Sequence, residues 1–260
     1  MSATTPQVSL FASAIRAERW LPWYERLRAN NDTRFEVVFV GPKAPLVTLP
    51  PEFRFIQSDV KGSQCAAIAA QQTKAPVMLQ VVDDVEYSEH AIDLMYRALL
   101  AEPKVMTTAR YFYGERDVSW SQNCTGTSEP RLPLLPVCGM FTRKAYEEAQ
   151  GFDRRYRHVF WELDFYMRLL IQHGYETRFV NARCVELLEI NPFEERLSTK
   201  SRDHDYALFN LMWNVDEFLS GRAPKLARRW GFEGFGGDNL LGMSLPSAGD
   251  ETTHLPISGL

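Results

Sequence analysis

The sequence contains no apolar run of the about 18 residues that a transmembrane helix requires. Its start, MSATTPQVSL, lacks the charged and apolar regions of a secretory signal peptide. The few cysteines show no close spacing typical of a zinc site or a disulfide scaffold; they are Cys65, Cys124, Cys138 and Cys184. We therefore expect a cytoplasmic protein with reduced, mostly buried thiols and no integral membrane segment.

A strong excess of charge of either sign is also missing, because 29 Lys and Arg stand against 33 Asp and Glu. The net charge of −4 gives no global signature of a nucleic-acid binder. The content of 45% hydrophobic and 24% charged residues is typical of a globular chain with a real core. A length of 260 residues fits one large domain or two small ones.

The first hundred residues alternate between strand and helix patterns. Short apolar runs predict strands at Val8–Ala14, Phe35–Val40, Phe53–Gln57 and Val77–Val82. Between and after them, helical patterns cover Arg19–Asn30, Gly62–Ala75 and Glu89–Glu102, the last with Ser88 as its expected N-cap. This alternation predicts an α/β fold with a mixed, mostly parallel central sheet flanked by helices.

Two adjacent aspartates follow the fourth predicted strand, in the stretch VMLQVVDDVEYS. Asp83 and Asp84 should lie where this strand leaves the core, since unpaired charges are rarely buried. Ligands of open α/β sheets bind at the carboxyl ends of the strands, and two carboxylates there suit a hard divalent cation together with phosphates. An ordinary strand end that turns into solvent explains the same residues equally well.

A second acidic pair opens a predicted helix at Trp161–His173, which Gly174 ends. Glu162 and Asp164 lie in its first turn, where the helix dipole favours negative charge. The simpler interpretation is therefore a pair of surface carboxylates. Large aromatic residues crowd the same turn, however, and a carboxylate in apolar surroundings can act as a general base.

Taken in order, these segments resemble family 2 glycosyltransferases of the GT-A fold, from about Val8 to Asn210. VSLFASAIRAERWL resembles the first strand and donor-binding loop, VMLQVVDDVEYS the strand with the metal-binding DxD motif, and WELDFYMRL the helix with the catalytic base. The resemblance implies a GT-A, Rossmann-like domain over residues 1–220, with a donor half at about 7–100 and an acceptor half at about 101–220. A helical extension closes this domain, and we expect residues 221–260 to form a flexible tail or lid.

The resemblance also implies the site residues. Glu162 and Asp164 are the candidates for the catalytic base, and Asp84 and His204 are the candidates for the ligands of Mn²⁺ or Mg²⁺, with Lys200 as a further candidate near the diphosphate. The expected donor-binding residues are Ala12, Ser13, Arg16, Gly41, Gly62, Gln64 and Asp83.

The chain departs from the family pattern at three places. Gly41 and Pro42 stand where the family usually has two aspartates that contact the base. Ala66 and Ala67 replace an Arg and an Asn, and Val82 replaces the first acid of the DxD motif. Glu86 offers an alternative acid two positions after Asp84.

The expected reaction moves a sugar from a nucleoside-diphosphate sugar to an acceptor hydroxyl, with inversion. A cation stabilises the leaving diphosphate, and a carboxylate takes the proton of the acceptor. In the segment RRYRHVF, Arg154 and Arg155 precede Trp161, and together they predict a site for an anionic acceptor such as a phosphate-bearing glycan, a lipid phosphate or nucleic acid. A solvated basic loop is the competing interpretation.

Two other functions remain open for the same fold. A catalytically silent module that binds sugar nucleotides or glycans is compatible with the altered donor motifs. A nucleotidyltransferase that makes sugar nucleotides usually carries a Gly-rich, basic loop after its first strand, whereas this chain has ASAIRAER. A glycosidase could also use two carboxylates, but nothing in the sequence indicates a secreted hydrolase.

Overall fold

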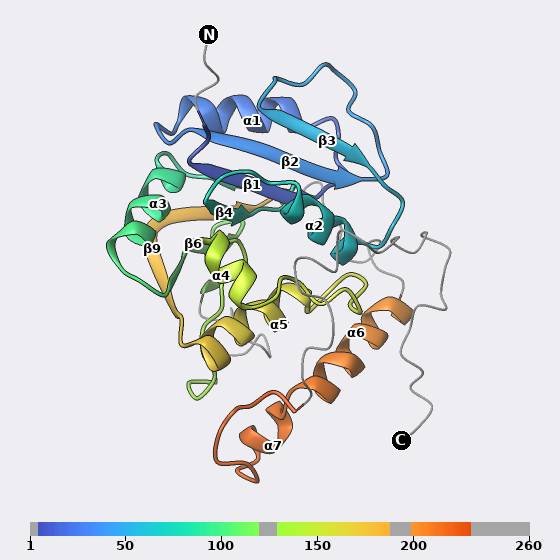
Figure 1. The fold of residues 1–260 in the computed structure, drawn as a ribbon, viewed down its shortest axis with the longest axis vertical. Helices are drawn as coiled ribbons and strands as arrows, with labels where there is room; N and C mark the ends of the chain where they lie inside the picture. Colours follow the sequence, from blue (N-terminus) through green and yellow to red (C-terminus); the bar gives the residue numbers. More distant parts are fainter. Residues whose placement is uncertain (1–4, 120–128, 188–198, 230–260) are drawn as a thin grey trace.

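The computed structural model describes residues 5–119, 129–187 and 199–229, and its strands form one nine-stranded sheet (Figure 1). The order is β3-β2-β1-β4-β8-β6-β9-β5, with β7 paired to β6. The strands are β1 (Val8–Ser13), β2 (Phe35–Gly41), β3 (Phe53–Gln57), β4 (Val77–Gln80), β5 (Val85–Tyr87), β6 (Val105–Tyr113), β7 (Arg116–Asp117), β8 (Gly139–Thr142) and β9 (Glu176–Glu186). The helices are α1 (Trp20–Ala29), α2 (Gly62–Gln71), α3 (Ala91–Ala101), α4 (Arg143–Glu148), α5 (Trp161–Met167), the π-helical turn η2 (Arg168–Gln172), α6 (Thr199–Met212) and α7 (Val215–Leu219).

Most strands of the sheet run in one direction. Parallel pairing joins β3, β2, β1 and β4, and β6 pairs in parallel with β9. β8 lies antiparallel between β4 and β6. β5 pairs antiparallel with β9 at the edge of the sheet, and the short β7 pairs antiparallel with β6. The predicted mixed, mostly parallel α/β sheet is confirmed, and its first four strands have the order of a Rossmann-like fold.

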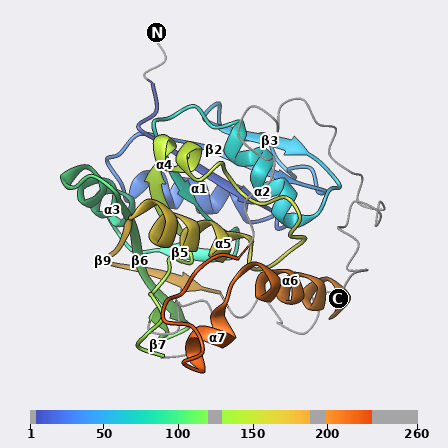
Figure 2. The same cartoon turned by 60° about the horizontal axis from the view of Figure 1, so that its bottom comes forward.

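The sheet separates two apolar layers. All seven residues of β2 are buried, as expected for a parallel strand that is covered on both faces. On one face, Trp20, Trp23, Tyr24 and Leu27 form the buried stripe of α1, and α3 packs beside it. The other face is covered by α2, α4 and α5, and α6 adds buried residues to the same apolar cluster (Figures 1 and 2).

The C-terminal helices pack against the second layer rather than standing apart from it. The Phe160 ring stacks on Phe209 of α6, with 5.0 Å between centroids. After α7 the chain returns to α6, where residue 228 forms an isolated bridge with Trp213 and Leu226 is buried. Residues 221–229 belong to the segment that we expected to form a flexible tail or lid, and within them Leu226 and residue 228 contact the domain. Residues 230–260 lie outside the described residues.

Within the three described ranges, no helix combines the length and the apolar character that crossing a membrane requires.

Candidate active site

A cleft of about 480 Å³ opens at the carboxyl ends of β1 and β4. These two strands are neighbours, but the chain continues from β1 to β2 on one side and reaches β4 on the other. Such a switch point leaves a crevice between the loops that follow the two strands, and open α/β sheets bind ligands there. The cleft is lined from β1 by Ser13 and Arg16, from the β4–β5 turn by Asp83 and Asp84, and from α5 by Trp161 and Glu162.

Asp83 anchors the loop between β1 and α1. Its Oδ2 accepts the backbone N–H groups of Ile15 and Arg16, each at 2.7 Å, and the indole N–H of Trp20 at 3.2 Å. Its Oδ1 pairs with the guanidinium of Arg16. Although Asp83 lines the cleft, its carboxylate is occupied by groups of its own chain, and it holds this loop in place.

Arg16 also contacts the second aspartate, because its Nη2 lies 3.3 Å from Oδ2 of Asp84. Glu86, the alternative acid, points elsewhere and pairs with Arg19 and Arg26 on the α1 side. A further acid of the same cleft is Glu186, which stands opposite Val85 in the β5–β9 pairing. Asp84 and Glu186 therefore present carboxylates from adjacent strand ends.

Glu162 lies in the first turn of α5 and lines the other side of the cleft. Its Oε2 is buried and has no hydrogen-bond partner among the described residues. Burial raises the pKa of Glu162 to about 7, and the negative charge of Asp205 contributes in the same direction. A carboxylate with this pKa is suited to accept a proton near neutral pH.

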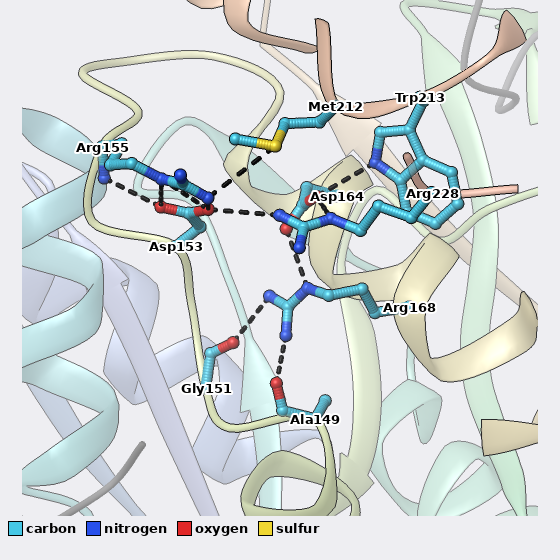
Figure 3. Close-up of polar contacts among 9 residues, drawn as sticks. All are labelled: Ala149, Gly151, Asp153, Arg155, Asp164, Arg168, Met212, Trp213 and Arg228. Carbon is cyan, nitrogen blue, oxygen red and sulfur yellow. Dashed lines mark hydrogen bonds and ion pairs between the residues drawn. The ribbon is translucent and has the colours of Figure 1, made fainter. Parts of the chain in front are cut away.

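Asp164, the second predicted acid, is completely buried and does not line the cleft. Figure 3 shows the side chains that contact it. Its Oδ2 accepts from Nε of Arg168 at 2.8 Å, while its Oδ1 accepts from Trp213 at 3.0 Å and from Arg228 at 3.2 Å. Two positions along a helix turn the side chain by more than half of the circumference, so the two acids cannot face the same space. The structure places Asp164 in an ion-pair network instead.

The predicted acceptor residues divide in the same way. Trp161 lines the cleft and meets Phe152 edge to face at 4.7 Å between centroids. The guanidinium of Arg155 instead pairs with the buried Asp153, which also pairs with Arg228 (Figure 3). Arg154 is 6% exposed and, like Arg155, is not part of the cleft lining.

Of the predicted donor residues, Gly62 lines the cleft, like Ser13, Arg16 and Asp83. Ala12 belongs to the core on the α1 face. Gln64 accepts the backbone N–H of Lys61 at 3.3 Å and so caps its own helix. Gly41 allows β1 and β2 to approach, since a Cβ there would lie 1.9 Å from the carbonyl oxygen of Ala14.

The predicted metal ligand His204 is not among the residues that line the cleft with Asp84. Its Nδ1 lies 2.9 Å from Oδ1 of Asp205. The side chain of Lys200 lies outside the described residues. The described chain also contains a possible ligand group at Asp32, His90 and Asp93. This group lies beside the amino ends of β1 and β2, whereas the cleft lies at the carboxyl ends of the strands. Asp93 already accepts hydrogen bonds from Thr33 there.

Four charged or titratable side chains of the cleft were missing from the predicted site, and one of them is the buried thiol of Cys65 on α2. Glu186 ends β9, His158 precedes α5, and Arg202 lies on α6. The sequence carries a signal only for His158, which belongs to the basic segment RRYRHVF. Glu186 and Arg202 reach the cleft through long-range packing that no local pattern reports.

Comparison with known proteins finds no matching family model and no significantly similar curated protein.

Proposed function

We propose that the chain is a glycosyltransferase of the GT-A type, which moves a sugar from a nucleoside-diphosphate sugar to an acceptor hydroxyl. The observation that carries the proposal is the position of Glu162, whose raised pKa suits a general base, in the same switch-point cleft as Asp84. The resemblance of the sequence to family 2 glycosyltransferases supports the same reaction.

The residues on the strand side of the cleft suit the donor. Asp84 and Glu186 offer carboxylate oxygens from adjacent strand ends, and such oxygens are the ligands that Mg²⁺ or Mn²⁺ prefers. When bound, such a cation supplies positive charge for the leaving diphosphate. Arg16 and Arg202 add cations of the chain itself, and both guanidinium groups suit phosphate oxygens.

The helix side of the cleft suits the acceptor. Glu162 takes the proton of the acceptor hydroxyl as that oxygen attacks the anomeric carbon on the face opposite the leaving group, which inverts the configuration. Trp161 offers an apolar ring beside this carboxylate. An anionic acceptor remains part of the proposal through Arg202 and His158, in place of Arg154 and Arg155.

Turnover of a donor tests this proposal. Purified protein is incubated with UDP-, GDP-, CDP- and dTDP-sugars with and without Mn²⁺, and release of the nucleoside diphosphate is followed. Water can serve as the acceptor in slow hydrolysis, so release does not require the natural acceptor. We expect release from one donor class, stimulated by Mn²⁺ and reduced about 100-fold or more in Glu162→Gln and Asp84→Asn.

The matched controls are Glu147→Gln, an exposed acid on α4, and Asp216→Asn, an exposed acid on α7. Both should release the nucleotide at the wild-type rate. The second candidate function, a silent module that binds sugar nucleotides or glycans, is favoured by the pairing of Asp84 with Arg16. Tight binding of one donor with no release of its nucleoside diphosphate at any Mn²⁺ concentration would support the silent module and contradict the proposed enzymatic activity.

A further inference from the structure

Asp205 on α6 is a fully buried carboxylate outside the cleft lining. Its oxygens accept three consecutive backbone N–H groups, from Arg157 at 2.9 Å, His158 at 2.7 Å and Val159 at 2.9 Å. Nδ1 of His204 lies 2.9 Å from its Oδ1. Because three consecutive N–H groups bind this one buried carboxylate, Asp205 fixes the backbone of these residues.

The same backbone is held from its other side by α2. The carbonyl oxygen of Arg157 accepts the N–H of Ser63 at 3.0 Å, and the carbonyl oxygen of Tyr156 accepts the hydroxyl of Ser63. Residues 156–160, which we call the clamp segment, therefore direct carbonyl groups to α2 and N–H groups to α6. Since almost every buried backbone group needs a partner, these two helices together decide where the segment lies.

The clamp segment leads directly into the first turn of α5. Its last residue, Phe160, has a φ of 63°, in the left-handed region that a phenylalanine adopts only when its surroundings impose it. Its ring packs on Phe209, one turn after Asp205 on α6. The position of the next two residues, Trp161 and Glu162, consequently depends on contacts that α6 makes.

We propose that Asp205 is a positioning residue, which holds the clamp segment so that Glu162 faces the cleft as the base. The role of Glu162 as a base rests on the proposed function. The contacts by which Asp205 fixes the clamp segment do not depend on it. His158 is fixed by the same carboxylate and lines the cleft beside Gly62, where a Cβ would lie 3.4 Å from its Nδ1. Asp205 therefore places two titratable side chains of the cleft.

Charged and titratable groups that share the cleft with Glu162 or interact with it bear on its titration. They are Arg16 and Asp84 on the strand side, Glu186 at the end of β9, His158 in the clamp segment, Tyr166 on α5, and Arg202 and Asp205 on α6. The arginines favour the ionised carboxylate, whereas the acids disfavour it. Removing the charge of Asp205, or letting water enter as the segment loosens, lowers the pKa of Glu162 in both cases.

The test compares wild type with Asp205→Asn and with Asp203→Asn, an exposed acid of the same helix. Glutamate carboxyl carbons are labelled with ¹³C, the Glu162 signal is assigned from Glu162→Gln, and it is titrated by NMR. We expect a midpoint near 7 in wild type and in Asp203→Asn, and a downward shift of about half a unit or more in Asp205→Asn. Amide hydrogen exchange should accelerate at His158 and Val159 in this variant alone.

Neither readout needs a substrate, so the result separates this inference from the proposed function. If a donor is turned over, Asp205→Asn should also lower kcat by about tenfold or more, with little change in KM, because it misplaces the base. Should Asp205→Asn fail to fold, Asp205→Glu keeps the charge but displaces the oxygens, and it should still accelerate exchange at both amides. An unchanged Glu162 midpoint with unchanged exchange in a folded variant would overturn the inference.

Discussion

Nη2 of Arg16 lies 3.3 Å from Oδ2 of Asp84, so the acid that we assign to a metal site is paired with a cation of its own chain. The side chain of Arg16 is 12% exposed and that of Asp84 is 7% exposed, which limits screening of this pair by water. A divalent cation that binds Asp84 must therefore compete with the guanidinium.

This competition gives the first prediction. Arg16→Gln removes the competing charge, and we expect its affinity for Mn²⁺ to rise about fivefold to tenfold above that of wild type in calorimetric titration. Arg26→Gln is the matched control, because Arg26 pairs with Glu86 and its side chain is 53% exposed. Equal Mn²⁺ affinity in wild type and Arg16→Gln would contradict a metal role for Asp84.

The second prediction concerns stability and pH. Burial raises the pKa of Glu162 to about 7, whereas an unfolded glutamate titrates near 4.3. The folded state therefore binds this proton more tightly, and its contribution to stability is lost as pH rises from the lower value to the higher one. The Glu162→Gln variant has no such carboxyl group and therefore does not lose this stability. The difference in free energy of unfolding, variant minus wild type, should increase by roughly 2 kcal/mol between about pH 5 and about pH 8.

Urea unfolding at several pH values measures this difference. Glu147→Gln replaces an exposed glutamate and should remain parallel to wild type over the same range. A constant difference between Glu162→Gln and wild type would show that the carboxylate titrates normally and is unsuited as a base at neutral pH.

The ion-pair network around Asp164 gives the third prediction (Figure 3). Asp164→Asn leaves the buried guanidinium of Arg168 with a neutral partner in place of its acid and removes one of the two acids that pair with Arg228, whose other acid is Asp153. We expect a loss of about 3–5 kcal/mol in the free energy of unfolding, measured by urea denaturation, against almost none for the exposed Asp216→Asn. A folded Asp164→Asn variant of wild-type stability would contradict the structural role that the network gives to this acid.

The fourth prediction compares the thermal stability of alanine variants at Gly41 and Gly62, two of the predicted donor-binding residues. Gly41→Ala brings a Cβ within 1.9 Å of the Ala14 carbonyl oxygen, so the ends of β1 and β2 must move apart. We expect a cost of roughly 3 kcal/mol or more, seen as a lower Tm. Gly62→Ala meets only ordinary contacts, the nearest at 3.4 Å, and should change Tm little. Similar Tm values for both variants would show that the two strands tolerate separation.

Much of the fold could be predicted because its first four strands carry dense local patterns. The predicted strands at 8–14, 35–40 and 53–57 agree with β1, β2 and β3 within one residue at each end. Elements that depend on distant partners were missed. Val85–Tyr87 is a strand because it pairs with β9, about a hundred residues later, and the predicted helix at 161–173 changes to a π-helical turn at Arg168.

Ser88 illustrates the same limit. It matches the preference for an N-cap, but its hydroxyl accepts the N–H of Arg183 on β9, and α3 begins at Ala91 without a side-chain cap. Tertiary pairing thus overrode a local preference.

The candidate site was predictable to the extent that it follows strand ends and helix starts. Asp83 and Asp84 line the cleft because both follow β4, and Glu162 does because it opens α5. The choice between Glu162 and Asp164 was not available from the sequence, since it depends on which face of α5 meets α6. Asp205 gave no signal at all, because its three N–H partners precede it by 46 to 48 residues.

Calorimetric binding of UDP, GDP, CDP and dTDP to the wild-type protein, with and without Mn²⁺, tests most directly whether the cleft between Asp84 and Glu162 binds the proposed donor. We expect saturable binding of one nucleoside diphosphate, strengthened by Mn²⁺ and weakened in Asp84→Asn. Absence of binding by all four nucleotides under both conditions would contradict it.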